Sequence, residues 1–398
     1  MGSLLIKVLS KGDDMKNVDY WELLNKHQTN IDHINLGFHN LHLFEQMSPY
    51  PHSEGGIMER VTNALECLPS KYRGAALSVF SSVIYVPDSF LSAALNYLWW
   101  SASTSAFHNY GIEVSEQADN IHIMEVDQSG LISQFAHINK LSARLNADVH
   151  PRISDVQQLR AMISNSLINN PDSSVEQEYT TEQLRLVANK DAWIVLTDKA
   201  LSGQSLIADL KRIEFSRRLL THGEHYPTIF VCAQIMTSLA EDKINTWITK
   251  NEIESIQILS AIKFDNRTRV GHEECALFDN KTHESVKKLC IWFDKNVVAK
   301  DMSLTFRKHS RGELTFGYHN TGLTLVDCLN TPTNSLPLLW FNALDHSATY
   351  QEGEKIIPYI GPFPRIHSRR GGSSQRVNEN ILWENIISQF ENGRSNLF

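Results

Sequence analysis

A carboxylate and a turn of small polar residues follow one short apolar run in this chain. Trp193–Leu196 has the composition of a buried strand, and Thr197 and Asp198 come directly after it. Residues 199–205, which we call the phosphate loop, come next, and apolar positions at helical spacing then run from Leu206 to about Leu220. Backbone N–H groups at the start of a helix have no partner within the helix, and the helix dipole favours negative charge there. The pattern therefore predicts an anion site between a strand and a helix.

The side chains of the phosphate loop suit an ester phosphate. Gly203 has no Cβ to keep the backbone away from a ligand, and the hydroxyls of Ser202 and Ser205 can donate to phosphate oxygens. Ser205 could also cap the helix. The residues expected to surround the phosphate are Lys199, Ala200, Leu201, Ser202, Gly203, Gln204 and Ser205. A plain strand–turn–helix with a serine cap is the structural alternative; a Walker A loop does not fit, because no Gly-Lys-Ser/Thr ending is present.

This stretch resembles the PRPP-binding loop of type I phosphoribosyltransferases, in which two acidic residues, three variable residues and Thr/Ser-Gly-x-Thr/Ser follow an apolar strand. Asp198 matches the second acid, and Thr197 stands where the first acid is usual. The residues that match the phosphate-binding positions are Ser202, Gly203 and Ser205. The resemblance implies that PRPP binds with Mg²⁺ and that its 5′-phosphate lies in the phosphate loop. It also implies that Asp198 and Thr197 belong to the catalytic centre, with Asp198 near the ribose and only indirectly at the metal.

A second polar turn lies between an expected strand, Ile121–Val126, and an expected helix, Leu131–Leu141. The turn consists of Asp127, Gln128, Ser129 and Gly130. In type I phosphoribosyltransferases a short turn in this relative position binds the pyrophosphate of PRPP, so the resemblance assigns that role to these four residues. A purely structural turn with a left-handed residue explains the same sequence. The polar stretch 169–178 lies where the family has a mobile lid, although a solvated linker would have the same composition.

A loop near residue 330 carries amide and hydroxyl groups suited to a base edge or a ribose. The side chains expected to contact an acceptor base are Asn330, Thr331 and Asn334. A structural turn built on asparagine and proline is the alternative. The pattern NTPxNxLPxxW, which ends at Trp340, resembles the PRTase-CE group, a divergent phosphoribosyltransferase-like family of bacterial conflict systems that includes proteins encoded beside retron reverse transcriptases. This resemblance covers roughly residues 20–345.

Clustered cations occur at two places. The densest basic stretch, Pro362–Gly372, includes Arg365, Arg369 and Arg370, which could contact a phosphate or a nucleic-acid backbone or could belong to a solvated surface loop. On the helix after the phosphate loop we expect four basic residues on the solvent face, namely Lys211, Arg212, Arg217 and Arg218.

The elements that must position these residues change character along the chain. Residues 17–110 have the pattern of amphipathic helices, including 56–68, 71–86 and 89–101, and from about residue 120 strands alternate with helices. Further strands are expected at 256–264, 314–318 and 321–326. This alternation predicts an α/β fold, a mainly parallel sheet flanked by helices as in type I phosphoribosyltransferases, with an N-terminal helical extension. The expected domains are 1–110, mostly helical; 111–345, the α/β core; and 346–398, a C-terminal extension with the basic loop and a terminal helix.

Composition indicates a folded cytoplasmic protein. Of the 398 residues 42% are hydrophobic and 21% are charged, as in soluble domains, and no apolar run reaches the roughly 18 residues of a membrane span. Five widely spaced cysteines without a CxxC pair indicate reduced thiols and neither a disulfide framework nor a zinc site. The net charge of -8 disfavours a general nucleic-acid coat. The sequence is compatible with a homo-oligomer.

The resemblance implies an enzyme that acts at the anomeric carbon of PRPP or a related ribose-phosphate donor, with electrostatic stabilisation of a cationic sugar. It also implies a toxic effector of a retron-type anti-phage system, held inactive by a complex of reverse transcriptase with msDNA or its ncRNA. Two alternatives stay open. One is a non-catalytic nucleotide-sensing or protein-binding module, which Thr197 favours, and the other is a nucleosidase or NAD glycohydrolase that uses the same loop.

Overall fold

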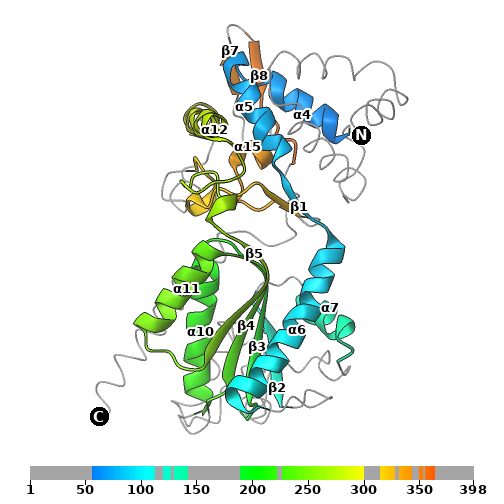
Figure 1. The fold of residues 1–398 in the computed structure, drawn as a ribbon, viewed down its shortest axis with the longest axis vertical. Coiled ribbons are helices and arrows are strands. Elements are labelled where there is room, and N and C mark those ends of the chain that lie inside the picture. The colour runs from blue at the N-terminus through cyan, green and yellow to red at the C-terminus, as the bar shows by residue number, and fades with distance from the viewer. Residues whose placement is uncertain are drawn as a thin grey trace, which may run out of the picture. The chain divides into compact units, whose positions relative to one another are not determined.

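The computed structural model describes residues 56–112, 120–126, 130–141, 189–221, 226–299, 314–327, 331–342, 349–352 and 355–363. These residues form two compact units (Figure 1). The sheet unit contains the described residues from Leu91 to Phe264, and the helical unit contains those up to Phe90 and those from Asp265 to Phe363. The predicted domain boundaries at residues 110 and 345 do not coincide with this division and stay a prediction.

Four parallel strands form the central layer of the sheet unit, in the order β2-β3-β4-β5. Their bounds are Ile121–Glu125 for β2, Ala192–Ala200 for β3, Thr228–Thr237 for β4 and Ile256–Phe264 for β5. The register places Ile121 beside Ala192, Ala192 beside Thr228, and Ile229 beside Ile256. Neighbouring parallel strands need crossover connections, and the helices between them supply these connections. The predicted α/β fold with a parallel sheet is confirmed.

Helices cover both faces of this sheet (Figure 1). They are α6 (Asp88–Tyr110), α7 (Leu131–Ile138), α10 (Gln204–Thr221) and α11 (Ser238–Lys250). Successive strand side chains alternate between the faces, so Trp193 and Val195 pack with α10 and α11 while Ile194 and Leu196 pack with α6 and α7. Burial on both faces explains why this strand is a continuous apolar run and not an alternating one.

The second half of α10 is buried all round, from Arg212 to Arg217. The expected solvent position is therefore wrong for Arg212, which is 7% exposed, and for Arg217, which is 1% exposed, while Lys211 and Arg218 are exposed. Six consecutive helical residues cannot all face one neighbour, so the helix lies in the interior over this stretch.

Arg217 joins the end of α10 to the starts of two strands. Its Nη2 lies 2.6 Å from Oε2 of Glu214, and the same guanidinium donates to the carbonyl of Pro227 at 2.9 Å and to that of Glu254 at 3.0 Å. It also stacks over the ring of Tyr226, 4.7 Å from the centroid. Burial lowers the pKa of Arg217, and the carboxylate of Glu214 opposes that effect.

The helical unit packs helices and short strands around one apolar core. Its longer helices are α4 (Ile57–Glu66), α5 (Ser70–Ser81) and α12 (Asn280–Phe293). Its strands are β1 (Ile84–Val86) parallel to β6 (Leu325–Asp327), and β7 (Thr349–Glu352) antiparallel to β8 (Lys355–Pro358). Short helical turns are η3 (Asn266–Thr268), η4 (Asp294–Val298), η5 (Tyr318–Asn320) and α15 (Pro337–Trp340). Phe80, Phe293 and Phe341 lie fully inside the core.

Two expected elements of this unit differ from the structure. The pattern over 71–86 predicts one helix, but α5 ends at Ser81 and the last three residues are β1, paired with β6. The expected strand 314–318 is absent: the chain there bends, because Gly317 has φ +76° and the following His319 also has a left-handed φ. Expected helices before residue 56 and between 151 and 188 lie outside the described residues. Within the described ranges no helix combines the length and apolarity needed to cross a membrane.

Candidate phosphate-binding site

Asp198 and Lys199 lie near the carboxyl end of β3. The strand stays paired with β4 as far as Ala200, which lies opposite Met236, so it is longer than predicted and the turn after it is shorter. The Nζ of Lys199 lies 3.4 Å from Oδ2 of Asp198, and the two side chains are 14% and 13% exposed. An ion pair shielded from water to this degree is stronger than one on the surface. It stands at the sheet edge where parallel α/β sheets bind ligands.

Three residues, Leu201–Gly203, turn the chain from β3 into α10. The first hydrogen bond of the helix runs from the N–H of Ile207 to the carbonyl of Gly203 at 2.9 Å. The N–H groups of residues 204–206 come before this bond and are the donors at the helix start. Gly203 therefore occupies the N-cap position, and Ser205 lies in the first turn of the helix and not at the cap position considered for it.

The structure gives Gly203 a reason to lack a side chain that differs from the predicted one. Its φ is +76°, a left-handed conformation that residues with a Cβ adopt at a cost. A Cβ at this position would lie 3.0 Å from the carbonyl oxygen of Ala240 in α11. The glycine thus allows a close contact between the loop backbone and the first turn of α11.

Thr237, the last residue of β4, fastens the phosphate loop to the start of α11. Its Oγ1 donates to the carbonyl of Leu201 at 2.6 Å and accepts the N–H of Ala240 at 3.1 Å. The residue is fully buried. Sequence reasoning missed it. A threonine directly before a helix is a capping signal, which could have revealed its role at α11 but not its bond to Leu201.

The loop has a buried part and an exposed part. Leu201 is 5% exposed and Ser202 7% exposed, and Gly203 is also buried, whereas Gln204 and Ser205 are exposed. The accessible donors of the predicted loop are therefore gathered on the first turn of α10, namely the side chains of Gln204 and Ser205 and the N–H groups at the helix start.

Thr197 points away from this accessible part. It is 2% exposed and pairs in register with Ala233, which belongs to the face covered by α10 and α11. Its Oγ1 lies 3.5 Å from the carbonyl of Lys199. Since neighbouring strand residues face opposite sides, Thr197 and Asp198 do not present their side chains together.

At the predicted pyrophosphate turn, a carboxylate of the protein already lies at the start of α7. Oε1 of Glu125 accepts the N–H of Gly130 at 3.4 Å, and Oε2 accepts the N–H of Ile132 at 3.3 Å. Gly130 has a left-handed φ of +75°. A pyrophosphate at this helix start would compete with Glu125 for the same donors. The assignment of this turn stays a prediction, and Asp127, Gln128 and Ser129 lie outside the described residues.

The described part of the predicted base-binding loop is engaged within the helical unit. The hydroxyl of Thr331 is buried and donates to the carbonyl of Phe363 at 2.9 Å. The amide of Asn334 donates to the carbonyl of Tyr318 at 3.1 Å and to Oγ1 of Thr321 at 3.0 Å. These bonds are those of a structural asparagine and proline turn, and contact with a base stays a prediction. Asn330, Arg365, Arg369 and Arg370 lie outside the described residues.

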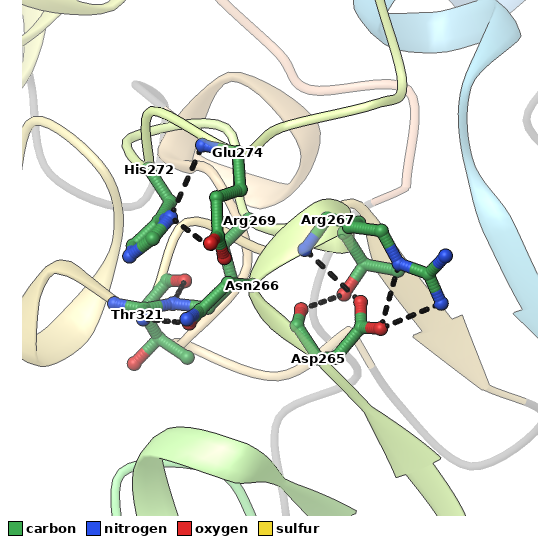
Figure 2. Close-up of polar contacts among 8 residues, drawn as sticks. Asp265, Asn266, Arg267, Arg269, His272, Glu274 and Thr321 are labelled. Atoms are coloured by element: carbon green, nitrogen blue, oxygen red, sulfur yellow. Dashed lines mark hydrogen bonds and ion pairs between the residues drawn. The ribbon is translucent and has the colours of Figure 1, made fainter.

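A polar cluster that sequence reasoning did not single out follows β5 in the chain (Figure 2). Asp265 accepts the backbone N–H of Arg267 at 3.0 Å and its Nε at 2.8 Å, and these bonds hold the pKa of the Asp265 carboxyl below its usual range. Arg269 donates to the carbonyl of Thr321 at 3.0 Å and to Oδ1 of Asn266 at 2.8 Å. Arg269 is therefore a brace between two loops of the helical unit, whereas Arg267 pairs with Asp265 of its own loop.

The buried thiols are not suited to nucleophilic chemistry. Burial raises the pKa of Cys232 and of Cys290 to about 12, so both thiols are protonated at neutral pH. Across the ranges that the structure describes, no three His, Cys, Asp or Glu side chains gather in a way that could hold a metal ion.

Comparison with known families gives a match that includes both loops singled out above. A model of the PRTase-CE family matches residues 69–365, well over half of the chain. No curated protein and no solved structure matched the chain.

Proposed function

Because the chain belongs to the PRTase-CE family, we propose that it is a phosphoribosyltransferase-like enzyme that acts on PRPP or a related ribose-phosphate donor. The observation that carries the proposal is the turn from β3 into α10. There a shielded carboxylate, Asp198, stands one short turn away from an exposed helix start with a hydroxyl at Ser205. Ribose 5-phosphate esters present two matching groups, hydroxyls and a terminal dianion, on one molecule.

In the proposed complex, the 5′-phosphate accepts hydrogen bonds from the N–H groups of the first turn of α10 and from Ser205. Asp198 accepts hydrogen bonds from ribose hydroxyls. Lys199, which lies 3.4 Å from Asp198, adds a positive charge beside the ribose position. Transfer then proceeds through a sugar with cationic character, which Asp198 stabilises through its charge, and no protein nucleophile is needed.

Mg²⁺ fits this site only through the substrate. Among the described residues no carboxylate cluster could hold the ion, and Asp198 is a single carboxylate already paired with Lys199. Mg²⁺ often binds through one carboxylate together with substrate oxygens, which agrees with the indirect role proposed for Asp198. When bound, Mg²⁺ neutralises pyrophosphate charge as the bond to the sugar breaks.

A second candidate is a nucleotide sensor that binds the same ligand without turnover. The observation in its favour is the burial of Thr197, which is 2% exposed at the position where type I phosphoribosyltransferases have their first acid. Only one carboxylate, that of Asp198, would then face the ribose. A sensor retains the phosphate contacts at α10 and lacks part of the charge that stabilises the transition state.

The biological role we propose follows from the family alone. The resemblance to conflict-system members supports a toxic anti-phage effector restrained by a retron reverse transcriptase and its msDNA or ncRNA. Expression of the chain alone should then arrest growth, and co-expression of the neighbouring reverse transcriptase and ncRNA should relieve the arrest. Growth without arrest in the absence of both partners would argue against an effector.

The enzymatic proposal is tested by incubation of the chain with labelled PRPP and Mg²⁺ and measurement of pyrophosphate release. Asp198→Asn should lower the rate by about 100-fold or more, because it removes a charge from the transition state. Asp191→Asn is the matched control: this residue precedes the other end of the same strand and accepts a hydrogen bond from Asn120 at 3.0 Å, which an amide oxygen can also accept. Tight binding of PRPP without release would favour the sensor. If the chain neither binds PRPP nor releases pyrophosphate, the proposal that it uses this ligand is refuted.

A further inference from the structure

Helix α6 is apolar on two opposite faces. One face packs on the sheet through buried residues that include Leu95, Leu98 and Ala102. The other face exposes large aromatic side chains, and the exposed fractions are 62% for Phe90, 51% for Tyr97, 64% for Trp100 and 57% for Phe107. Figure 1 shows α6 in cyan as a long helix along one side of the sheet. Several exposed aromatic residues on one helix form a patch of the kind that marks an interaction surface.

The exposed face of α6 also lacks charge. The helix, DSFLSAALNYLWWSASTSAFHNY, contains no Lys, Arg or Glu, and its only acidic residue is Asp88 at the start. Surface helices usually carry charged residues opposite their buried stripe, and 21% of this chain is charged. A face of alanine, serine, threonine and aromatic residues is instead suited to contact another helix.

The spacing of the exposed residues is that of a helix pair. Phe90, Tyr97, Trp100 and Phe107 are separated by seven, three and seven positions, and two small residues, Ala93 and Thr104, occupy the remaining positions of the same seven-residue repeat. Such a repeat keeps one seam of a helix facing a partner helix over its whole length. Knobs on that seam insert between residues of the partner.

We propose that α6 packs antiparallel against the α6 of a second copy of this chain. Read from either end, the seam has the same order of sizes: large, small, large, large, small, large. A two-fold axis at the middle of the seam therefore places Phe90 against Phe107 of the other copy, Ala93 against Thr104, and Tyr97 against Trp100. A two-fold interface needs this self-complementarity, because each residue must fit the residue that it meets in both copies.

The ends of the helix agree with the antiparallel arrangement. In this arrangement the N-terminal end of each α6 lies beside the C-terminal end of the other, so the two helix dipoles oppose each other. Two chains of net charge -8 repel, and this seam brings them together where the surface carries almost no charge.

A lipid surface fits the face less well. Helices that lie on membranes carry Lys and Arg along their polar side, and α6 has neither. A helix pair of this length, about 34 Å at 1.5 Å per residue, lies at the small end of stable interfaces, so a dissociation constant on the order of micromolar is expected.

The test is the oligomeric state of the full chain by sedimentation equilibrium over a range of concentrations. The wild-type chain should dimerise, and Trp100→Glu should weaken the dimer at least about tenfold, because it buries a charge at the centre of the seam. Ile291→Glu is the matched control: Ile291 is 43% exposed on α12, a helix of the helical unit, and the dissociation constant of this variant should stay within about threefold of wild type. Circular dichroism and the melting temperature show whether each variant is folded, and Trp100→Ala gives a milder change at the same position.

A pair of charges tests the direction of the helices. Phe90→Lys and Phe107→Glu should each weaken the dimer, and the double variant should regain most of the affinity, because the two introduced charges meet only across an antiparallel two-fold seam. A monomeric wild-type chain would overturn the proposal, as would a dimer that Trp100→Glu leaves intact or a double variant weaker than both single ones. Binding of the monomer to anionic vesicles that is lost in Trp100→Glu would assign the face to lipid and also overturn it. None of these outcomes depends on whether the chain uses PRPP.

Discussion

The hydroxyl of Thr237 lies 2.6 Å from the carbonyl oxygen of Leu201, across the boundary between two crossover units of the sheet. The hydroxyl oxygen of Thr237 also accepts the N–H of Ala240 at 3.1 Å. One buried group therefore connects the end of β4, the start of α11 and the loop that we propose for phosphate. The position of the donors on α10 depends on a residue that would not itself touch the ligand.

Thr237→Val should move the phosphate loop as well as weaken the fold. The isosteric side chain leaves the Leu201 carbonyl and the Ala240 N–H buried without a partner, which we expect to lower the free energy of unfolding by about 1–3 kcal/mol. If the loop binds ribose phosphates, the affinity for ribose 5-phosphate should also fall, by about tenfold, measured by calorimetry well below the melting temperature. Thr237→Ser should retain most of the stability and most of the affinity, since serine keeps the hydroxyl.

Thr228→Val is the control for this prediction. Thr228 is 5% exposed at the opposite end of the same strand, so the variant makes the same change far from the loop. It should leave the affinity for ribose 5-phosphate unchanged. Equal losses of affinity in both variants would mean that Thr237 acts only through overall stability. Hydrogen exchange at residues 203–206 reports the loop position even if no sugar phosphate binds.

Gly203→Ala and Gly130→Ala should differ in cost although the two backbones are alike. Their φ values are +76° and +75°, so each alanine carries a left-handed penalty of about 1 kcal/mol. At Gly130 nothing lies within 4 Å of the added Cβ, whereas at Gly203 it meets the Ala240 carbonyl at 3.0 Å. We expect about 2–3 kcal/mol for Gly203→Ala. Urea denaturation measures both, and equal values would show that α11 yields to the extra methyl group.

Arg217→Met should be among the most damaging single changes in the sheet unit. The change removes the closest partner of the Glu214 carboxylate, whose side chain is only 7% exposed, and leaves this charge in the interior. Loss of one member of a buried ion pair costs about 3–5 kcal/mol. Arg218→Met removes the other partner of Glu214, but this side chain is 50% exposed, so less than about 1 kcal/mol is expected. Thermal or urea unfolding of the two variants compares them, and a similar loss in both would contradict the role given to burial.

The buried cysteines should resist modification in the folded chain and weaken the fold at high pH. Burial raises the pKa of Cys232 and Cys290 to about 12, so the folded state keeps protons that the unfolded chain releases above about pH 8.5. Their contribution to stability is therefore full below that pH and is lost as the pH rises towards 12. Iodoacetamide at pH 9, followed by site-resolved mass spectrometry, should label Cys67, which is partly exposed, much faster than Cys232 or Cys290. The control is labelling in urea, where Cys67, Cys232 and Cys290 should react at equal rates.

The sheet could be predicted because apolar residues follow one another in its strands but recur at helical spacing in its helices. Trp193–Leu196 and Ile256–Phe264 are apolar runs bounded by polar turns, and the structure has β3 and β5 there. β5 has the predicted ends, whereas β3 extends to Ala200, because β4 offers ten buried residues to pair with. Strand length was therefore decided by a neighbour that is distant in sequence. The same is true of β1, which looks like the end of a helix until β6 is present.

The turn from β3 into α10 was predictable in position, but the reasons for its residues were not. The order of strand, acid, serine, glycine and serine located the turn, yet the contact that requires Gly203 comes from Ala240, and the bond that fixes Leu201 comes from Thr237. The role of Glu125 was missed for a similar reason. This last residue of β2 accepts the N–H groups of Gly130 and Ile132, which lie across the turn at the start of α7. No local pattern reveals such contacts. Arg212 and Arg217 were expected in solvent because an arginine pattern alone does not report that a helix is covered on every side.

The burial of β4 decides how short a fragment of this protein can be if the candidate site is to stay folded. All ten of its residues are buried, and its neighbours on both sides, β3 and β5, run parallel to it. A fragment cut before Ile256 would leave one whole edge of that strand open to water and to other chains, a setting in which strands tend to aggregate. A peptide or truncated version meant to isolate the turn after β3 must therefore continue through Phe264 to keep that turn in its folded shape.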